Sequence, residues 1–230
     1  LERMRAMRRT RGLSYDAVMS LALHVSDPPA LAERMDFSGR PPRLDARLDT
    51  AETRALLKDL RDLATKARWA DFMTAEAPLH HVAATRLVDA VSNTSITPWF
   101  DRELGVRQGA SYLLVPGLLN GGQNYGVGVQ FMDGSPEEIR PVIGIWKWDS
   151  EGKPTFDGSI VPLVVHELCH TYTNPLVDRH EAALKPAGEK LLATAARQME
   201  RQAYGTWKTV MYETLVRAMV VRYMRDTFGA

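Results

Sequence analysis

Apolar residues recur at helical spacing through most of the first hundred positions of the chain. An apolar residue every three or four positions marks one face of an α-helix, so this pattern predicts helices. The segments that show it are 14–25, 49–77, 79–93 and a short piece at 97–105. Ser14 is a suitable N-cap for the first helix, and Asp49 or Thr50 for the second, because their side-chain oxygens can accept from backbone N–H groups.

The pattern then changes to short runs of β-branched and aromatic residues. These runs cover 111–119, 124–132 and 140–148, and the turn-rich segments NGGQ and DGSPEE separate them. Because short connections join antiparallel neighbours, we expect a small, mainly antiparallel meander. Gly126 and Gly128 leave one face of the second run nearly bare, which often marks the close approach of another backbone.

Helical patterning returns after the predicted sheet, over 160–173, about 186–203 and 206–227. An order of helices, sheet and helices predicts an α+β fold. The length suits a single domain spanning 1–230. Its expected parts are a helical region at 1–105, the sheet with one helix at 106–173, and C-terminal helices at 174–230.

The composition is that of an ordinary globular protein and indicates no nucleic-acid partner. Apolar residues make up 45% of the chain, charged residues 25%, and the net charge is +1. Proteins that follow phosphate backbones concentrate basic charge on one face, and the body of the chain has no such stripe. No apolar run approaches the length that a membrane span needs, so we expect none.

The sequence assigns neither a compartment nor an oligomeric state. Cys169 is the one cysteine, so no disulfide can form within the chain. The chain does not begin with Met and is expected to be a processed or excised form. A removed signal peptide would imply a secreted or periplasmic protein, and its absence a cytoplasmic one.

The stretch IVPLVVHELCHTYTNPL carries the candidate chemistry. Ser159 is a suitable N-cap, Pro162 fits the first turn, and Asn174 before Pro175 predicts the end of a helix over 160–173. Cys169 lies within the motif and is expected to be a buried thiol that acts as a small hydrophobe.

Two histidines lie four residues apart in this helix, with a glutamate after the first. His166 and His170 therefore share one helix face, and Glu167 lies about 100° around it. In the His-Glu-x-x-His pattern the histidines hold Zn²⁺ and the glutamate is the general base on water. The pattern arises by chance in roughly one chain in a hundred of this length, so a helix face without metal is the alternative.

A zinc site of this kind needs a third protein ligand. Glu213 lies in the middle of a strongly apolar helix, where a carboxylate is costly unless it is paired or binds metal. Its alternative role is a simple ion pair with Arg217, four residues later. His180 is a rival ligand, but no glycine turn precedes it to place it as in metzincins.

The segments VVHELCHTYTNPL, QAYGTWKTVMYETLVRAMVVRYM, LLNGGQNYGVGV and TPWFDRELG resemble the DUF4932 family of bacterial proteins, which is similar to gluzincin-type zinc peptidases. The resemblance runs from about residue 14 to the end and implies a zincin-like fold. It implies the zinc ligands His166, His170 and Glu213, with Glu167 as the catalytic base. It also implies that strand 124–132 pairs with extended substrate, with the contacts Asn124, Tyr125, Gly126, Val127, Gly128 and Arg217.

One position departs from the best-known gluzincins, which often carry an acid four residues after the glutamate ligand to orient a histidine. Arg217 stands there, so the groups that orient the ligands must be built otherwise. Peptide hydrolysis also needs a donor to the developing oxyanion. We favour Tyr204, in the turn before the ligand helix, over the other candidates Tyr212, Tyr223, His180 and Arg217.

These observations predict a zinc-dependent metallopeptidase that acts on a peptide or protein substrate. One alternative is a catalytically inactive protein of the same fold that binds a peptide or partner, and another is a zinc amidase acting on cell-wall material. A third is a helical interaction protein in which the motif is accidental.

Overall fold

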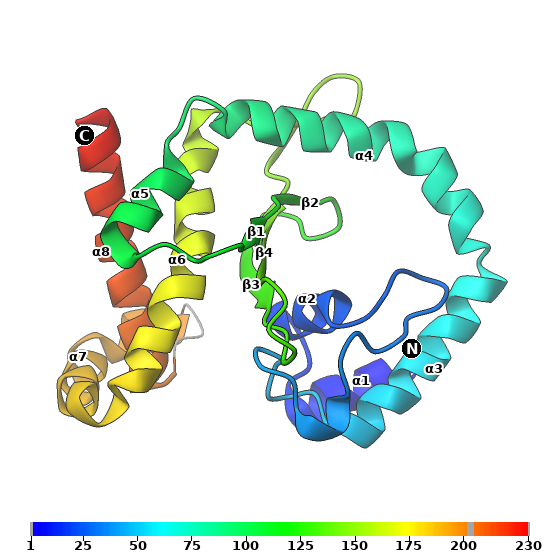
Figure 1. Cartoon of the computed structure of the whole chain (residues 1–230), viewed down its shortest axis with the longest axis horizontal. Coiled ribbons are helices and arrows are strands. Elements are labelled where there is room, and N and C mark those ends of the chain that lie inside the picture. The colour runs from blue at the N-terminus through cyan, green and yellow to red at the C-terminus, as the bar shows by residue number, and fades with distance from the viewer. Residues whose placement is uncertain (1, 202–204, 230) are drawn as a thin grey trace. The chain divides into compact units, whose positions relative to one another are not determined.

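The structure is a computed structural model that describes residues 2–201 and 205–229 (Figure 1). Its helices are α1 (Glu2–Arg11), α2 (Asp16–Leu23), α3 (Thr50–Lys66), α4 (Trp69–Val91), α5 (Ile96–Leu104), α6 (Val161–Arg179), α7 (Glu181–Arg201) and α8 (Trp207–Phe228). Its strands are β1 (Ser111–Tyr112), β2 (Val115–Gly117), β3 (Tyr125–Val129), β4 (Glu138–Gly144), β5 (Lys147–Trp148) and β6 (Pro154–Thr155). The fold is therefore α+β, mostly helical with a small sheet.

The chain divides into two compact units. The N-terminal unit combines Leu1–Ala90 with Arg107–Asp157, and the C-terminal unit combines Val91–Val106 with Gly158–Ala230. No helix within the described ranges combines the length and apolarity needed to cross a bilayer.

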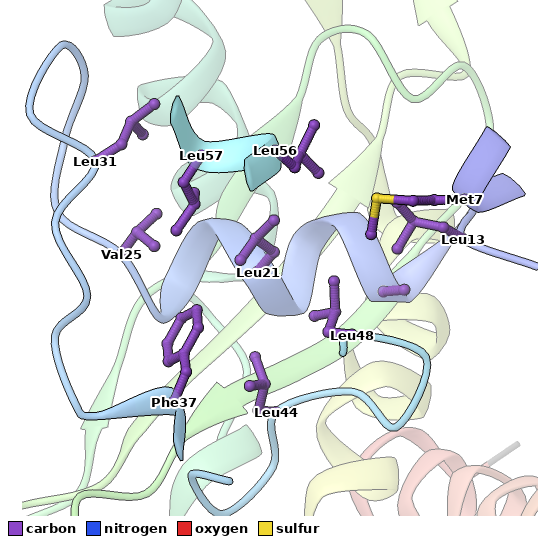
Figure 2. Close-up of a cluster of buried hydrophobic side chains, with 11 residues drawn as sticks. Met7, Leu13, Leu21, Val25, Leu31, Phe37, Leu44, Leu48, Leu56 and Leu57 are labelled. Atoms are coloured by element: carbon purple, nitrogen blue, oxygen red, sulfur yellow. The ribbon is translucent and has the colours of Figure 1, made fainter. Parts of the chain in front are cut away.

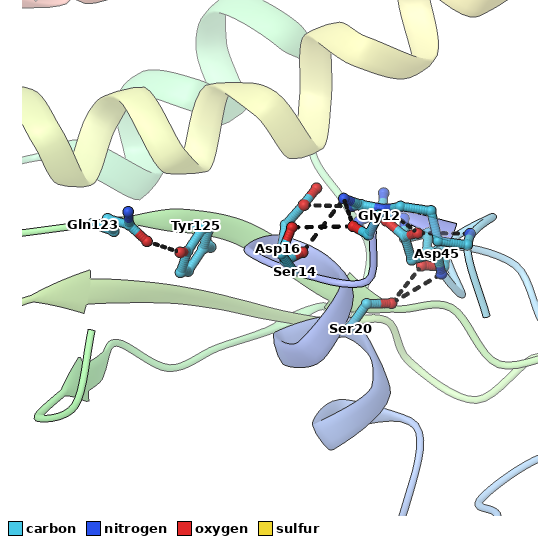
Figure 3. Close-up of polar contacts among 9 residues, drawn as sticks. Gly12, Ser14, Asp16, Ser20, Asp45, Gln123 and Tyr125 are labelled. Carbon is cyan, nitrogen blue, oxygen red and sulfur yellow. Dashed lines mark hydrogen bonds and ion pairs between the residues drawn. The ribbon is translucent and has the colours of Figure 1, made fainter. Parts of the chain in front are cut away.

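An apolar cluster around α2 forms a core of the N-terminal unit (Figure 2). Its buried members are Met7, Leu13, Ala17, Leu21, Val25, Leu31, Phe37, Leu44, Leu48, Leu56 and Leu57. Leu21 and Ala17 lie four residues apart on one face of α2, as the sequence pattern predicts. Arg47 links the start of α2 to the segment before α3, because its guanidinium donates to both Asp16 and Asp45 (Figure 3).

The helix boundaries of this unit correct part of the sequence prediction. Asp49 caps α3 by accepting from the N–H groups of Ala51 and Glu52, as expected. Ser14 does not cap α2, because its hydroxyl donates to the carbonyl of Gly12 instead. The break between the two long helices falls at Arg68, which adopts a positive φ of 51°. Pro78 therefore lies inside α4, which curves along its length (Figure 1).

The predicted antiparallel meander is wrong. β4 is the central strand, with β3 antiparallel on one side and the short β1 and β2 parallel to it on the other. Ile139 and Ile143 of β4 are fully buried, so the most apolar strand takes the position with partners on both sides. The sheet is mixed rather than mainly antiparallel. β5 and β6 form a separate antiparallel pair.

Glycine allows the close approaches that this sheet requires. A Cβ at Gly128 would lie 2.7 Å from the carbonyl oxygen of Glu138 on β4, which confirms that a backbone passes close to β3. A Cβ at Gly144 would collide with the carbonyl oxygen of Gly121 in the loop before β3. Within the described residues β3 pairs with β4 alone and is an edge strand.

The C-terminal unit is a bundle in which α6 packs along α8 (Figure 1). Aromatic rings fill its core: Phe100 of α5 stacks on Tyr172 of α6 at 4.9 Å, and Trp99 meets Tyr223 of α8 edge-on at 5.3 Å. The indole Nε1 of Trp99 also donates to Asp226 at 3.2 Å. These contacts hold α5 against both α6 and α8.

Helix α6 is longer than the sequence predicts. It begins after a 3₁₀ turn at Gly158–Ile160, so Ile160 rather than Ser159 occupies its N-cap position. It also continues through Pro175 to Arg179. Val177 is 1% exposed, so packing beyond the proline offsets the single helical hydrogen bond that Pro175 cannot make.

Candidate metal centre

His166 and His170 present their imidazoles side by side from one face of α6. Their positions one helical turn apart bring Nε2 of His170 to 3.1 Å from Nε2 of His166, with the ring planes at 79°. Both side chains are partly buried. Two ring nitrogens at this separation can face a single ion.

Glu213 of α8 completes the group. Its Oε1 lies 3.4 Å from Nε2 of His170, and its Oε2 lies 3.6 Å from Nε2 of His166. One ligand atom from each of the three side chains lies within 4.8 Å of the others. Val210 and Val216 are buried three residues to either side of Glu213, so the apolar face of α8 carries the carboxylate against α6.

One oxygen of the Glu213 carboxylate lacks a hydrogen bond. Its side chain is 10% exposed, and Oε2 is buried without a hydrogen bond. Arg217, the alternative partner, is there as predicted: its Nε lies 3.7 Å from Oε2, with the side chain 48% exposed. That ion pair is longer than a hydrogen bond, so the carboxylate contacts Arg217 and still faces both histidines.

The protonation state of His166 suits a metal ligand. Burial, with smaller contributions from the nearby His170 and Arg217, lowers the pKa of His166 to about 4. His166 is therefore a neutral imidazole at neutral pH, with a lone pair available on one nitrogen. Nδ1 of His170 lies 3.2 Å from Oδ1 of Asn174, which leaves its Nε2 facing Glu213.

A lysine and a tyrosine hold the site's two helices together on the surface. Lys208 of α8 pairs with Asp178 of α6 at 2.8 Å and with Glu181 of α7 at 2.8 Å. Tyr212, one of the candidate oxyanion donors, donates its hydroxyl to Asp178. Burial and the Asp178 carboxylate raise the pKa of that hydroxyl, which makes Tyr212 a structural link.

Glu167 and Cys169 are the other polar or ionisable residues within the motif. Glu167, next to His166, is 7% exposed. Cys169 is completely buried, and burial raises the pKa of its thiol to about 12. The prediction of a buried thiol is confirmed.

The remaining predicted site residues do not join the three ligands. His180 is exposed at the C-cap of α6, outside the metal-binding group found among the described residues. Tyr223 is fully buried against Trp99 and Phe228, so its hydroxyl is not accessible as an oxyanion donor. Tyr204, the favoured donor, lies outside the described residues.

The predicted substrate strand belongs to the N-terminal unit and has contacts of its own there. Oδ1 of Asn124 accepts from the N–H of Gly144. The hydroxyl of Tyr125 donates to Gln123 (Figure 3). Val127 is buried, and Gly126 and Gly128 pair with Pro141 and Ile139 of β4. The far edge of β3 forms no strand pair within the described residues.

Sequence reasoning missed Asn174 as a residue of the site. It was assigned only to the predicted helix end before Pro175. Because α6 continues through that proline, Asn174 lies four residues after His170 on the same face. The spacing His-x-x-x-Asn was the available signal.

Comparison with known proteins gives one relationship. The family DUF4932, described as a domain of unknown function, matches residues 9–230. No curated protein and no solved structure matches the chain.

Proposed function

The chain belongs to the DUF4932 family, and we propose from its metal-binding group that it is a zinc-dependent metallopeptidase with a zincin-like, gluzincin-type catalytic centre. The observation that carries the proposal is the convergence of His166, His170 and Glu213 within 4.8 Å, around a buried carboxylate oxygen that has no hydrogen bond. A bound cation would satisfy that oxygen.

The donor set favours zinc over the common hard cations. Calcium and magnesium take oxygen ligands, whereas two imidazoles and one carboxylate are the ligands of catalytic zinc in several peptidases. A three-ligand set leaves a coordination position for substrate or water. The neutral state of His166 at physiological pH removes the competition between proton and metal.

The proposed chemistry divides between the ion and one carboxylate. Zinc at these ligands would supply Lewis acidity, polarising a peptide carbonyl and making water more acidic. Glu167 would accept the proton of the attacking water and return it to the nitrogen of the leaving amine.

The test compares the parent with Glu167→Gln and with Glu189→Gln. Glu189 lies on α7 with a half-exposed side chain, so its variant controls for loss of a helical carboxylate in the same unit. Mass spectrometry should find about one zinc per chain in all three proteins. Cleavage of a peptide library should fall by about 10²–10⁴-fold in Glu167→Gln alone.

Several results would redirect the proposal. Parent-like cleavage by Glu167→Gln would remove the general-base role. A zinc-loaded parent that shields bound peptides without cutting them would identify an inactive peptide-binding protein. Release of products from a cell-wall digest, with no peptide cleavage, would identify an amidase.

A further inference from the structure

The His170 ring has a partner on each of its two nitrogens. On one side Nδ1 lies 3.2 Å from Oδ1 of Asn174, and on the other Nε2 lies 3.4 Å from Oε1 of Glu213. Asn174 and His170 are both on α6, and the side chain of Asn174 is half-buried. The ring is therefore held between an amide and the metal-binding group.

The amide contact decides which nitrogen of His170 carries hydrogen. An amide oxygen can only accept, so Nδ1–H donates to Oδ1 of Asn174. In a neutral imidazole the other nitrogen is then bare, and the Nε2 lone pair points towards Glu213 and His166. This is the tautomer that a metal ligand requires.

We propose that Asn174 is a positioning residue for zinc, holding His170 in its Nε2-ligating tautomer and ring orientation. The inference deepens the proposed function and rests on it, because it concerns the same metal group. Arg217 stands where an orienting acid would lie on α8, and a guanidinium has no acceptor for a ring N–H. The acceptor comes instead from α6 itself.

The continuation of α6 through Pro175 is what makes this arrangement possible. An asparagine four residues after a histidine lies on the same face only while the helix persists. A helix ending at Thr173 would release Asn174 from that face. The buried turn beyond the proline, which includes Val177, therefore supports the metal ligand indirectly.

Two substitutions separate positioning from plain helix structure. Asn174→Ala removes the acceptor, but alanine is the better helix former, so the metal-free protein should melt at the same temperature or higher. Its zinc affinity, measured by competition with a chromophoric chelator, should fall by about 10–100-fold. Asn174→Asp keeps an acceptor in the same place and should bind zinc at least as tightly as the parent.

Thr173→Val is the matched control. Thr173 donates to the carbonyl of Cys169 at 2.9 Å, so its variant also loses a side-chain hydrogen bond on α6, one residue away. The Thr173→Val variant should keep the parent's zinc affinity. Cobalt substitution adds a second readout, because the visible absorption of bound Co²⁺ should shift in Asn174→Ala and not in Thr173→Val.

The outcomes distinguish this inference from the proposed function. Unchanged zinc affinity in Asn174→Ala would overturn the inference and leave a zinc peptidase standing. Weaker zinc binding with a less stable metal-free protein, not rescued by Asn174→Asp, would also overturn it, as a structural effect. A parent without zinc affinity would overturn both. Zinc binding that depends on Asn174, without peptide cleavage, would uphold the inference and remove the peptidase.

Discussion

Oε1 of Glu213 on α8 lies 3.4 Å from Nε2 of His170 on α6, while the second oxygen of the same carboxylate is buried without a hydrogen bond. A buried charged oxygen in this state is a cost to the metal-free fold. The helices nevertheless bring it against two imidazoles. A cation bound there would remove that cost.

Glu213→Gln should therefore have opposite effects on stability and on metal. The amide keeps the shape but removes the charge, so the free energy of unfolding of the metal-free protein should rise by about 1 kcal/mol. Zinc binding should be lost, because a neutral amide is a poor ligand for zinc beside two imidazoles. Urea denaturation of the metal-free protein and metal analysis by mass spectrometry give the two values.

Glu189→Gln is again the exposed control and should change neither quantity. If Glu213→Gln instead destabilises the metal-free protein, the ion pair with Arg217 stabilises the fold by more than the buried oxygen costs. The main role of Glu213 would then be structural.

Zinc itself should stabilise the folded chain. A ligand that binds only the native state raises the free energy of unfolding by about 2.7 kcal/mol at a hundred times its dissociation constant. Scanning fluorimetry should show a higher melting temperature with zinc, reversed by a chelator. His170→Ala should lose the shift, whereas His180→Ala, on an exposed residue outside the group, should keep it. An equal melting temperature of the parent with and without zinc would show that the folded protein does not bind the ion.

Local patterns predicted the parts of this chain that depend on local geometry. The spacing of His166 and His170 fixes their shared face in any helix, and Asp49 caps α3 through neighbouring N–H groups. Glu213 was recognisable because a carboxylate is unusual in so apolar a helix. These inferences need no knowledge of how distant segments pack.

The errors arise where tertiary packing overrides a local signal. Pro78 and Pro175 both indicate a helix end, yet both lie inside helices. The sheet order depends on β4 being central, which the length of the connections does not encode. Asn174 was missed for the same reason, because its role follows from a helix that continues past a proline.

Gly188 is predicted to be required for the contact between α7 and α8. A Cβ there would lie 2.6 Å from the Trp207 ring and 2.9 Å from Cγ of Met211. Overpacking costs about 1–3 kcal/mol, at or above the gain of about 0.5–1 kcal/mol that alanine brings to a helix interior. Gly188→Ala should therefore lower the free energy of unfolding, measured by urea denaturation.

The neighbouring Ala187 provides the control for helix propensity, because it is exposed on α7. Ala187→Gly should destabilise by about 1 kcal/mol through propensity alone. A Gly188→Ala variant that is more stable than the parent would show that Trp207 moves aside at little cost.

Arg34 and Glu138 should make the N-terminal unit sensitive to acid. The guanidinium donates to both carboxylate oxygens, at 3.0 and 2.7 Å, and also to the carbonyl of Leu23. The hydrogen bonds from Arg34 lower the pKa of Glu138 below its usual value of 4.5, against the opposing effect of burial. The unfolded chain therefore binds a proton on Glu138 at a higher pH than the folded chain does.

The sign of the pH effect follows from that difference. The stability that the pair contributes is present above about pH 4.5 and is lost as the pH falls through the lowered pKa of the folded state. At pH 7, Glu138→Gln should lower the free energy of unfolding by about 2 kcal/mol, since hydrogen bonds to charged groups have about that value. Below the lowered pKa of the folded state the variant and the parent should differ little. Glu151→Gln, on an exposed turn residue, should have little effect at either pH, and a Glu138→Gln deficit that persists in acid would show that shape, not charge, is what Arg34 recognises.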